Sequence, residues 1–225
     1  MRGRSIFRAG LTCVALLALP ASAQVAPAEV QAGVAACADA NFSWLDCARG
    51  IERQALPGVG VSRSPGVLTL QTARATVRLK DTFDATGFPT TVYTYLGPAK
   101  PLPHHLVLQL HEEQSSHWLI DAESGHIAQL PSFPVVAPGG RHAVVASEDL
   151  GAGFRPNVLE IWRVADGAIQ REASFKPAWG PRAVRWVTAE RVEVTKVCLQ
   201  PTAPEPQLCG LASLTRRGGV WRLMD

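Results

Sequence analysis

The sequence predicts an all-β protein, a propeller-like stack of antiparallel meander sheets in three to four blades that form an incomplete ring. Two observations carry this prediction. From Gly58 onward, apolar residues alternate with polar ones in short runs bounded by Gly, Pro, Asp and Asn, as in strands joined by tight turns. These runs also repeat at a period near that of a four-stranded propeller blade, about 40 residues. A twisted β-sandwich of the same meanders is the alternative.

Residues 1–23 are predicted to be a secretory signal peptide. A basic start with three arginines precedes a short apolar run at 11–19, and the small residues Ala21 and Ala23 follow it. The run is much shorter than the roughly 20 residues that a membrane span needs. We therefore expect cleavage after Ala23, a periplasmic or secreted protein, and no membrane insertion after cleavage.

Loss of this segment would leave the chain without net charge. The full sequence has 22 Lys and Arg against 19 Asp and Glu, and residues 1–23 contain three arginines and no acidic residue. Nucleic acids and anionic membranes both attract proteins through a concentrated positive field. The balanced charge argues against both as partners.

Between the leader and the strands, residues 24–57 form an N-terminal segment with one short helix. The helix is expected over 47–56, where Pro57 and Gly58 end it. Its expected role is to cover an open sheet edge, because unpaired edges invite association.

Four cysteines remain after Ala23, namely Cys37, Cys47, Cys198 and Cys209. An even number in an exported protein indicates disulfides, although the spacing alone permits more than one connectivity. Proximity favours Cys37–Cys47, which would tether the helix, and Cys198–Cys209. A zinc site or free thiols are the alternatives, but the sequence has no CxxC pair.

The remaining residues, 58–225, form the predicted propeller-like β domain. Its clearest stretch is 133–175, which predicts a four-stranded antiparallel meander whose Asp166-Gly167 dipeptide is the strongest hairpin signal. Elsewhere, alternation predicts strands at 67–70, 75–79, 90–96, 105–111, 117–121, 126–130, 183–187, 191–197, 207–214 and 220–223. Trp118, Trp162, Trp186 and Trp221 fall within strands, and we expect them to fill space between sheets.

The repeat brings a resemblance to known blades. The segments 118–125 and 161–167 occupy the same place in successive units, with their glycines 42 residues apart. The segment PGGRHAVVAS at 138–147 resembles the SPDGRxLAxxS segment of WD40-like and TolB-type propeller blades, and IWRVADG at 161–167 resembles their IWDxxTG segment. The resemblance covers roughly 104–190 and implies the blade fold without an activity. The whole chain is similar in its order of elements to a group of small uncharacterised bacterial exported proteins.

The histidines offer one candidate metal site. All six lie between His104 and His142, and a hairpin that places Leu110 opposite Trp118 would set His111 opposite His117. Imidazole suits zinc or copper, so His111 and His117 are the weak metal candidates. The simpler interpretation is a polar strand face, because a slip of one residue would separate the pair.

One long connection is a candidate partner loop. Its residues, with a nearby tryptophan expected to be exposed, are Glu148, Asp149, Phe154, Arg155, Asn157 and Trp179. Carboxylates on a glycine-containing loop could also hold calcium, but the spacing of an EF-hand is missing.

No catalytic or cofactor motif is evident, so no cofactor is expected. The sequence has no Gly-x-Ser-x-Gly elbow, and its glycine-rich pieces lack the P-loop lysine. We therefore expect a non-enzymatic binding module that presents loops of the β domain to a protein or cell-envelope ligand. The alternatives are an inhibitor or assembly factor, and a small periplasmic hydrolase or metal-dependent enzyme that uses the His-rich strands at 104–126.

Overall fold

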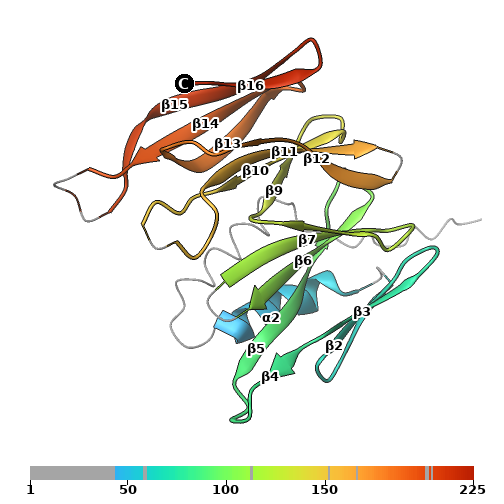
Figure 1. Cartoon of the computed structure of the whole chain (residues 1–225). Helices are drawn as coiled ribbons and strands as arrows, with labels where there is room; N and C mark the ends of the chain where they lie inside the picture. Colours follow the sequence, from blue (N-terminus) through green and yellow to red (C-terminus); the bar gives the residue numbers. More distant parts are fainter. Residues whose placement is uncertain are drawn as a thin grey trace, which may run out of the picture.

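The computed structural model describes residues 44–225 except 58, 59, 112, 113, 152, 166, 201, 202 and 204. The predicted signal peptide and Cys37 lie outside the described residues. The described chain consists of one helix and sixteen strands, and all strand pairs are antiparallel (Figure 1). The predicted all-β class is therefore confirmed. None of the described helices is long and apolar enough to cross a membrane.

The strands form four meander sheets that follow one another along the chain. The first sheet contains β1 (Val61–Ser64), β2 (Val67–Gln71) and β3 (Thr76–Lys80). The second contains β4 (Thr82–Phe83), β5 (Pro89–Pro98), β6 (His104–His111), β7 (Gln114–Asp121) and β8 (Ile127–Leu130). The third contains β9 (Pro134–Val136), β10 (His142–Ser147), β11 (Val158–Ala165) and β12 (Ala168–Phe175). The fourth contains β13 (Gly180–Thr188), β14 (Arg191–Cys198), β15 (Gln207–Arg217) and β16 (Val220–Met224).

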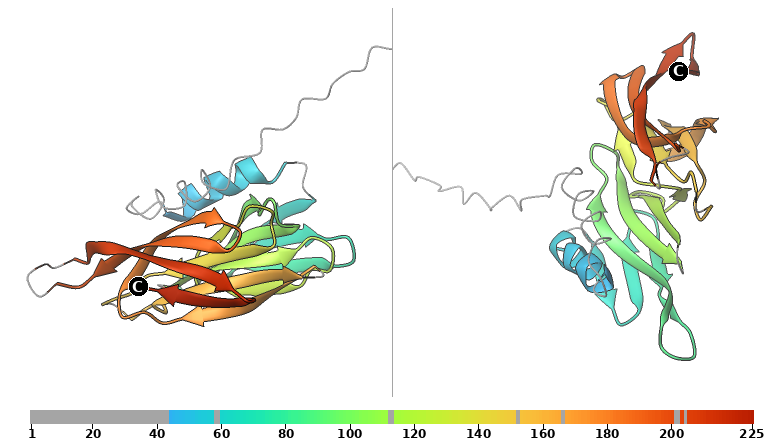
Figure 2. Two further views of the ribbon diagram at one scale, coloured as in Figure 1. Left: turned by 90° about the horizontal axis from the view of Figure 1, so that it is seen from above. Right: turned by 90° about the vertical axis from the view of Figure 1, so that its left-hand side faces the viewer.

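The four sheets are stacked in chain order, and in the part of the chain that the structure describes the stack is open rather than closed into a ring (Figures 1 and 2). Leu68, Tyr95 and Val107 represent the apolar cluster between the first two sheets. Leu119 and Val145 belong to the cluster between the second and third sheets. The cluster between the third and fourth sheets includes Leu159, Val194 and Leu214. Each inner sheet thus buries both faces, whereas each end sheet buries one.

Alternation explains why these segments are strands. In the third sheet, Val144 and Ile161 are register partners that face the fourth sheet, while Val145 faces the second. The predicted meander over 133–175 is confirmed, and Gly167 adopts the positive φ of 78° that its hairpin turn requires. The predicted tryptophans also pack against the clusters between sheets, as expected.

The structure contains two short strands that the sequence pattern did not predict, β1 and β4. In β1, Arg63 points inward beside the buried Val61, so the inward positions are not both apolar. The helix also begins earlier than expected. Labelled α2, it spans Trp44–Ala55 rather than 47–56.

The helix α2 packs against β5, where β4 is too short to pair the whole strand. Glu52 accepts the backbone N–H of Tyr95 at 2.9 Å, and Asp81 accepts that of Tyr93 at 2.9 Å. Arg49 and Arg63 donate to the backbone oxygen of Tyr93 at 2.9 and 2.5 Å. Side chains therefore supply hydrogen-bond partners for the backbone of β5 where no strand pairs with it. Two of these side chains come from the helix, which confirms its expected role of covering an open sheet edge.

The same four side chains form a buried ionic cluster. Arg63 bonds Glu52 at 2.6 Å, and Arg49 bonds Asp81 at 2.6 Å. Glu52 is 2% exposed and Asp81 is 4% exposed. Burial opposes ionisation of Glu52, but the two guanidinium groups and the Tyr95 N–H outweigh burial and lower its pKa.

The predicted disulfide between Cys198 and Cys209 is present, with a Cα–Cα distance of 5.8 Å. It joins the end of β14 to the start of β15 beside a proline-rich loop. Cys47 is also disulfide-bonded, while its expected partner, Cys37, lies outside the described residues. Such bonds persist in oxidising compartments, which agrees with export.

Candidate functional site

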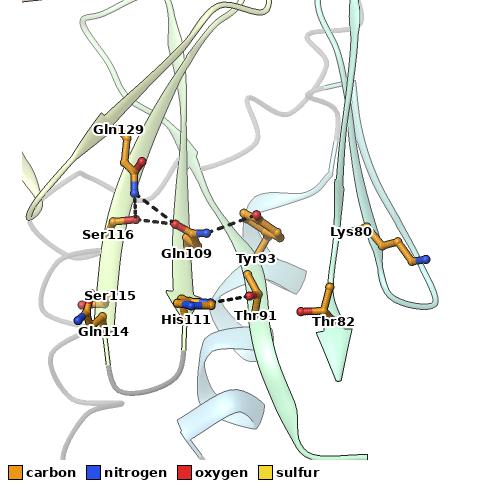
Figure 3. Close-up of a pocket in the computed structure, with 10 residues that line it drawn as sticks. All are labelled: Lys80, Thr82, Thr91, Tyr93, Gln109, His111, Gln114, Ser115, Ser116 and Gln129. Carbon is orange, nitrogen blue, oxygen red and sulfur yellow. Dashed lines mark hydrogen bonds between the residues drawn. The ribbon is translucent and has the colours of Figure 1, made fainter. Parts of the chain in front are cut away.

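A polar pocket of about 400 Å³ opens between the end of the first sheet and one face of the second (Figure 3). All of its lining side chains can donate or accept hydrogen bonds: Lys80, Thr82, Thr91, Tyr93, Gln109, His111, Gln114, Ser115, Ser116 and Gln129. The volume lies within the usual range of small-molecule sites, although such sites are generally more apolar. A polar lining of this kind suits a polar ligand.

Strand register brings these side chains together. Thr91 of β5 pairs with His111 of β6, which in turn pairs with Gln114 of β7. One step along the same face, Gln109 pairs with Tyr93 and with Ser116. These positions lie beyond the apolar cluster that the first sheet covers, so the face changes from apolar to polar where the two sheets separate.

The Gln109 amide is the centre of the hydrogen-bond network. Its Oε1 accepts from Ser116 Oγ at 2.8 Å and from Trp118 Nε1 at 3.1 Å. Its Nε2 donates to the Tyr93 hydroxyl at 3.4 Å. Gln129 Nε2 approaches both Ser116 Oγ, at 3.2 Å, and Gln109 Oε1, at 3.5 Å (Figure 3). Every amide in this network therefore has a defined orientation.

A ring contact holds Tyr93, an aromatic residue of the pocket lining. Tyr93 meets Trp118 edge to face, with the ring centroids 5.1 Å apart. Burial raises the pKa of the Tyr93 hydroxyl, so the hydroxyl stays neutral and can both donate and accept. Lys80 supplies the only side chain of fixed charge among the lining residues.

The expected His111–His117 pairing is wrong. His111 pairs with Gln114, whereas His117 pairs with Leu108, because the β6–β7 hairpin is tighter than expected. The difference of three residues is odd, so the two imidazoles lie on opposite faces of the sheet. His111 faces the pocket, while His117 packs edge to face on Phe133, with the ring centroids 5.5 Å apart.

The remaining histidines are mainly structural. Burial lowers the pKa of His117 to about 4, and also lowers the pKa values of His104, His105 and His142. Neutral imidazole is the form a metal would need, but the described residues contain no group of three His, Cys, Asp or Glu that could hold a metal ion.

Side chains of the candidate partner loop form hydrogen bonds to backbone groups within the loop and beside it. Asp149 accepts the backbone N–H groups of Gly153 and Arg155 at 2.8 and 2.7 Å. Asn157 donates to the backbone oxygens of Pro177 and Trp179 at 2.9 and 3.0 Å, which ties the loop to the start of β13.

The loop leaves an apolar side chain at the surface, since Phe154 is 52% exposed. Glu148 forms a two-point ion pair with Arg182 at 2.9 Å. The expected exposure of Trp179 is wrong, because only 7% of it is exposed. Its indole joins the cluster between the third and fourth sheets and donates to Asp225 at 3.2 Å. The use of this loop by a partner stays a prediction.

Comparison with known proteins gave no match to this chain. The chain matches no protein-family model, and neither a curated protein nor a solved structure shows significant similarity to it. The blade resemblance therefore stays a prediction, and the fold by itself does not define a function.

Sequence reasoning singled out His111 but missed the other residues of the pocket. Lys80, Thr91, Gln109 and Gln129 come from four different strands, and only their register and the packing of the first sheet unite them. A useful sequence signal was available at Gln109, a polar residue among leucines on a strand that is otherwise largely buried.

Proposed function

We propose that the protein is an exported, non-enzymatic binding module whose ligand site is the polar pocket between the first and second sheets. The observation that carries this proposal is the oriented network centred on Gln109 above the Tyr93–Trp118 ring pair. Such a network presents fixed donors and acceptors at little further entropic cost, which favours binding. The disulfide in the fourth sheet and the predicted leader support a location in the periplasm or outside the cell.

The residues that line the pocket fit a hydroxyl-rich ligand. We propose that the ligand is a saccharide of the cell envelope. Amide and hydroxyl groups can each donate and accept, as sugar hydroxyls also do. The aromatic ring of Tyr93 adds an apolar surface for the C–H face of a sugar ring. Lys80 would complement a carboxylate or phosphate on that sugar.

The test is a screen of soluble envelope oligosaccharides, followed by calorimetric titration of the best binder. Gln109→Leu should weaken binding about tenfold or more, because the network loses its central donor and acceptor. Gln170→Leu, an exposed glutamine on β12, is the matched control and should bind as the wild type. Saturable binding that Gln109→Leu leaves unchanged would place the ligand elsewhere, and no binding to any envelope saccharide would contradict the assigned class.

One observation favours the enzymatic alternative as a second candidate. Thr91 Oγ1 and His111 Nδ1 are 2.8 Å apart in the pocket, the distance of a hydroxyl paired with a general base. The same contact also follows directly from their cross-strand pairing. Hydrolysis of p-nitrophenyl acetate that Thr91→Val abolishes would favour the enzyme, whereas turnover equal to buffer would rule out this pair as an esterase.

A further inference from the structure

The outer face of the fourth sheet gathers arginines that are scattered in the sequence. Arg191 pairs with Thr215, and Thr215 pairs with Arg222, so the two arginines share one row and one face. Arg217 follows in the next row, opposite Val220. On the opposite side of the Arg191–Thr215–Arg222 row from Arg217, the next row on this face contains Arg185, which forms an ion pair with its register partner Glu193. All four arginines are exposed.

Aliphatic side chains lie beside these arginines on the same face of the sheet. Leu211 is 66% exposed, Val220 58% and Met224 55%. Among the described residues, ten large hydrophobic side chains are exposed, and six of them lie between Val187 and Met224. Exposed apolar groups concentrated on one sheet and its connections indicate an interaction surface more strongly than scattered ones.

The position of the sheet leaves this face uncovered by the described chain. The opposite face buries Val192, Val194 and Trp221 against the third sheet. In Figures 1 and 2 the fourth sheet is the last layer of the stack, and no other described element lies over its outer side. We name this surface, with Arg185, Arg191, Arg217, Arg222, Leu211 and Met224, the arginine face.

We propose that the arginine face binds the surface of anionic lipid membranes. Guanidinium groups form two-point contacts with phosphates, and exposed aliphatic side chains gain free energy when they enter the interfacial region. The face combines the two over a single sheet. The proposal is independent of the ligand that the polar pocket takes.

The charge and composition of the arginine face disfavour a second copy of the chain, a nucleic acid or a protein interface as its partner. Four arginines and one glutamate give the face a net positive charge, so two copies of the chain would repel one another there. None of the exposed large apolar residues of the face is aromatic, since Trp186 and Trp221 pack inward. Base stacking on nucleic acid and the hot spots of protein interfaces both rely largely on aromatic residues.

The experiment is cosedimentation of the exported protein with two kinds of vesicle, one of phosphatidylcholine alone and one of phosphatidylglycerol and phosphatidylcholine in equal parts. We expect binding to the anionic vesicles only, and a loss of binding as salt is added, because exposed charges are screened. Equal binding to both vesicles, or to neither, overturns the proposal.

Variants assign the binding to the face. Arg191→Gln with Arg222→Gln should weaken binding roughly thirtyfold, since each arginine near an anionic surface contributes about 1 kcal/mol. Arg78→Gln with Arg141→Gln removes the same charge from exposed positions on the first sheet and on the turn before β10, and should change binding little. An equal loss in both double variants overturns the proposal, because it would show a general charge effect.

A second pair of variants separates lipid from an acidic protein. Leu211→Ser with Met224→Ser should weaken vesicle binding, whereas Phe88→Ser, which alters an exposed side chain near β5, should not. Soluble polyglutamate should bind much more weakly than vesicles. Binding of polyglutamate as tight as that of vesicles would assign the face to an acidic protein and overturn the lipid proposal. Circular dichroism and thermal melting confirm that each variant is folded.

Discussion

Glu52 in the helix accepts the backbone N–H of Tyr95 in β5 at 2.9 Å, across 43 residues of sequence. The contact belongs to the buried ionic cluster that covers the β5 edge. Two acidic and two basic side chains balance one another there, so the helix is held by charges that all have partners.

Removal of one acidic partner from this cluster should destabilise the fold strongly. Glu52→Ala leaves Arg49 and Arg63 short of a partner and the Tyr95 N–H without its acceptor. The expected loss is about 3 to 5 kcal/mol of unfolding free energy, measured by urea denaturation. Glu123→Ala removes an exposed ion pair with Arg74 and should cost less than about 1 kcal/mol. Similar losses in both variants would contradict the importance assigned to the buried cluster.

Stability should fall in mild acid because of the buried histidines. The folded-state pKa of His117 is about 4, below its ordinary value of 6.5, so the unfolded chain binds a proton more readily between these values. Its neutral form therefore contributes stability above pH 6.5 that is lost as pH falls toward 4. The effect of His117 alone is about 3 kcal/mol across this window. Burial shifts His104, His105 and His142 in the same direction.

The measurement is a series of urea midpoints from pH 7 to pH 4. His117→Leu should flatten the pH dependence, because it removes the group whose pKa burial lowers most. A wild-type midpoint that stays constant down to pH 4 would show that the histidines do not control acid stability. Carboxylates with lowered pKa values, such as Glu52, add to the acid sensitivity only below about pH 4.5.

Loss of the disulfide in the fourth sheet should destabilise the protein by about 3 kcal/mol, on the chain-entropy estimate for a short loop. Cys198→Ser with Cys209→Ser tests this without affecting Cys47. Amide exchange should accelerate most at the end of β14 and the start of β15, which the bond joins. Exchange that accelerates equally in the first sheet would contradict a local role for the bond.

A glycine at the start of β13 should not tolerate a side chain. A Cβ at Gly180 would lie 2.7 Å from both Glu148 Cγ and Val197 Cγ2. Gly180→Ala should therefore cost about 1 to 3 kcal/mol through overpacking and displace the candidate partner loop. Gly151→Ala, where a Cβ would meet nothing within 4 Å, is the control for thermal melting. Equal melting temperatures would contradict the close packing.

Much of the fold was predictable because alternation is a local property. The meander over 133–175 was recognisable from its apolar periodicity and the Asp-Gly turn. β1 was not predicted, because Arg63 occupies an inward position that only a distant pair of carboxylates makes acceptable. Strand propensity and the alternation pattern describe only neighbouring residues. They do not identify the partners of Arg63, since Glu52 and Asp81 lie 11 and 18 residues away from it.

The candidate site was less predictable because it depends on register. The sequence indicated that His111 and His117 lie on neighbouring strands, but the turn length decided that they occupy opposite faces. The balanced charge of the chain likewise did not indicate the arginine face. Arg191 and Arg222 become neighbours only through two successive strand pairings.

The open stack also bears on how the chain is assembled. In a closed propeller the last strand has to find the first, so the fold is completed only when the whole chain has been released. Here each sheet pairs within itself and packs on the sheet next to it in the sequence. Repeat-like architectures with nearest-neighbour contacts can fold by propagation from one end. A chain of this kind can complete each layer in sequence order, with the layer before it as a template.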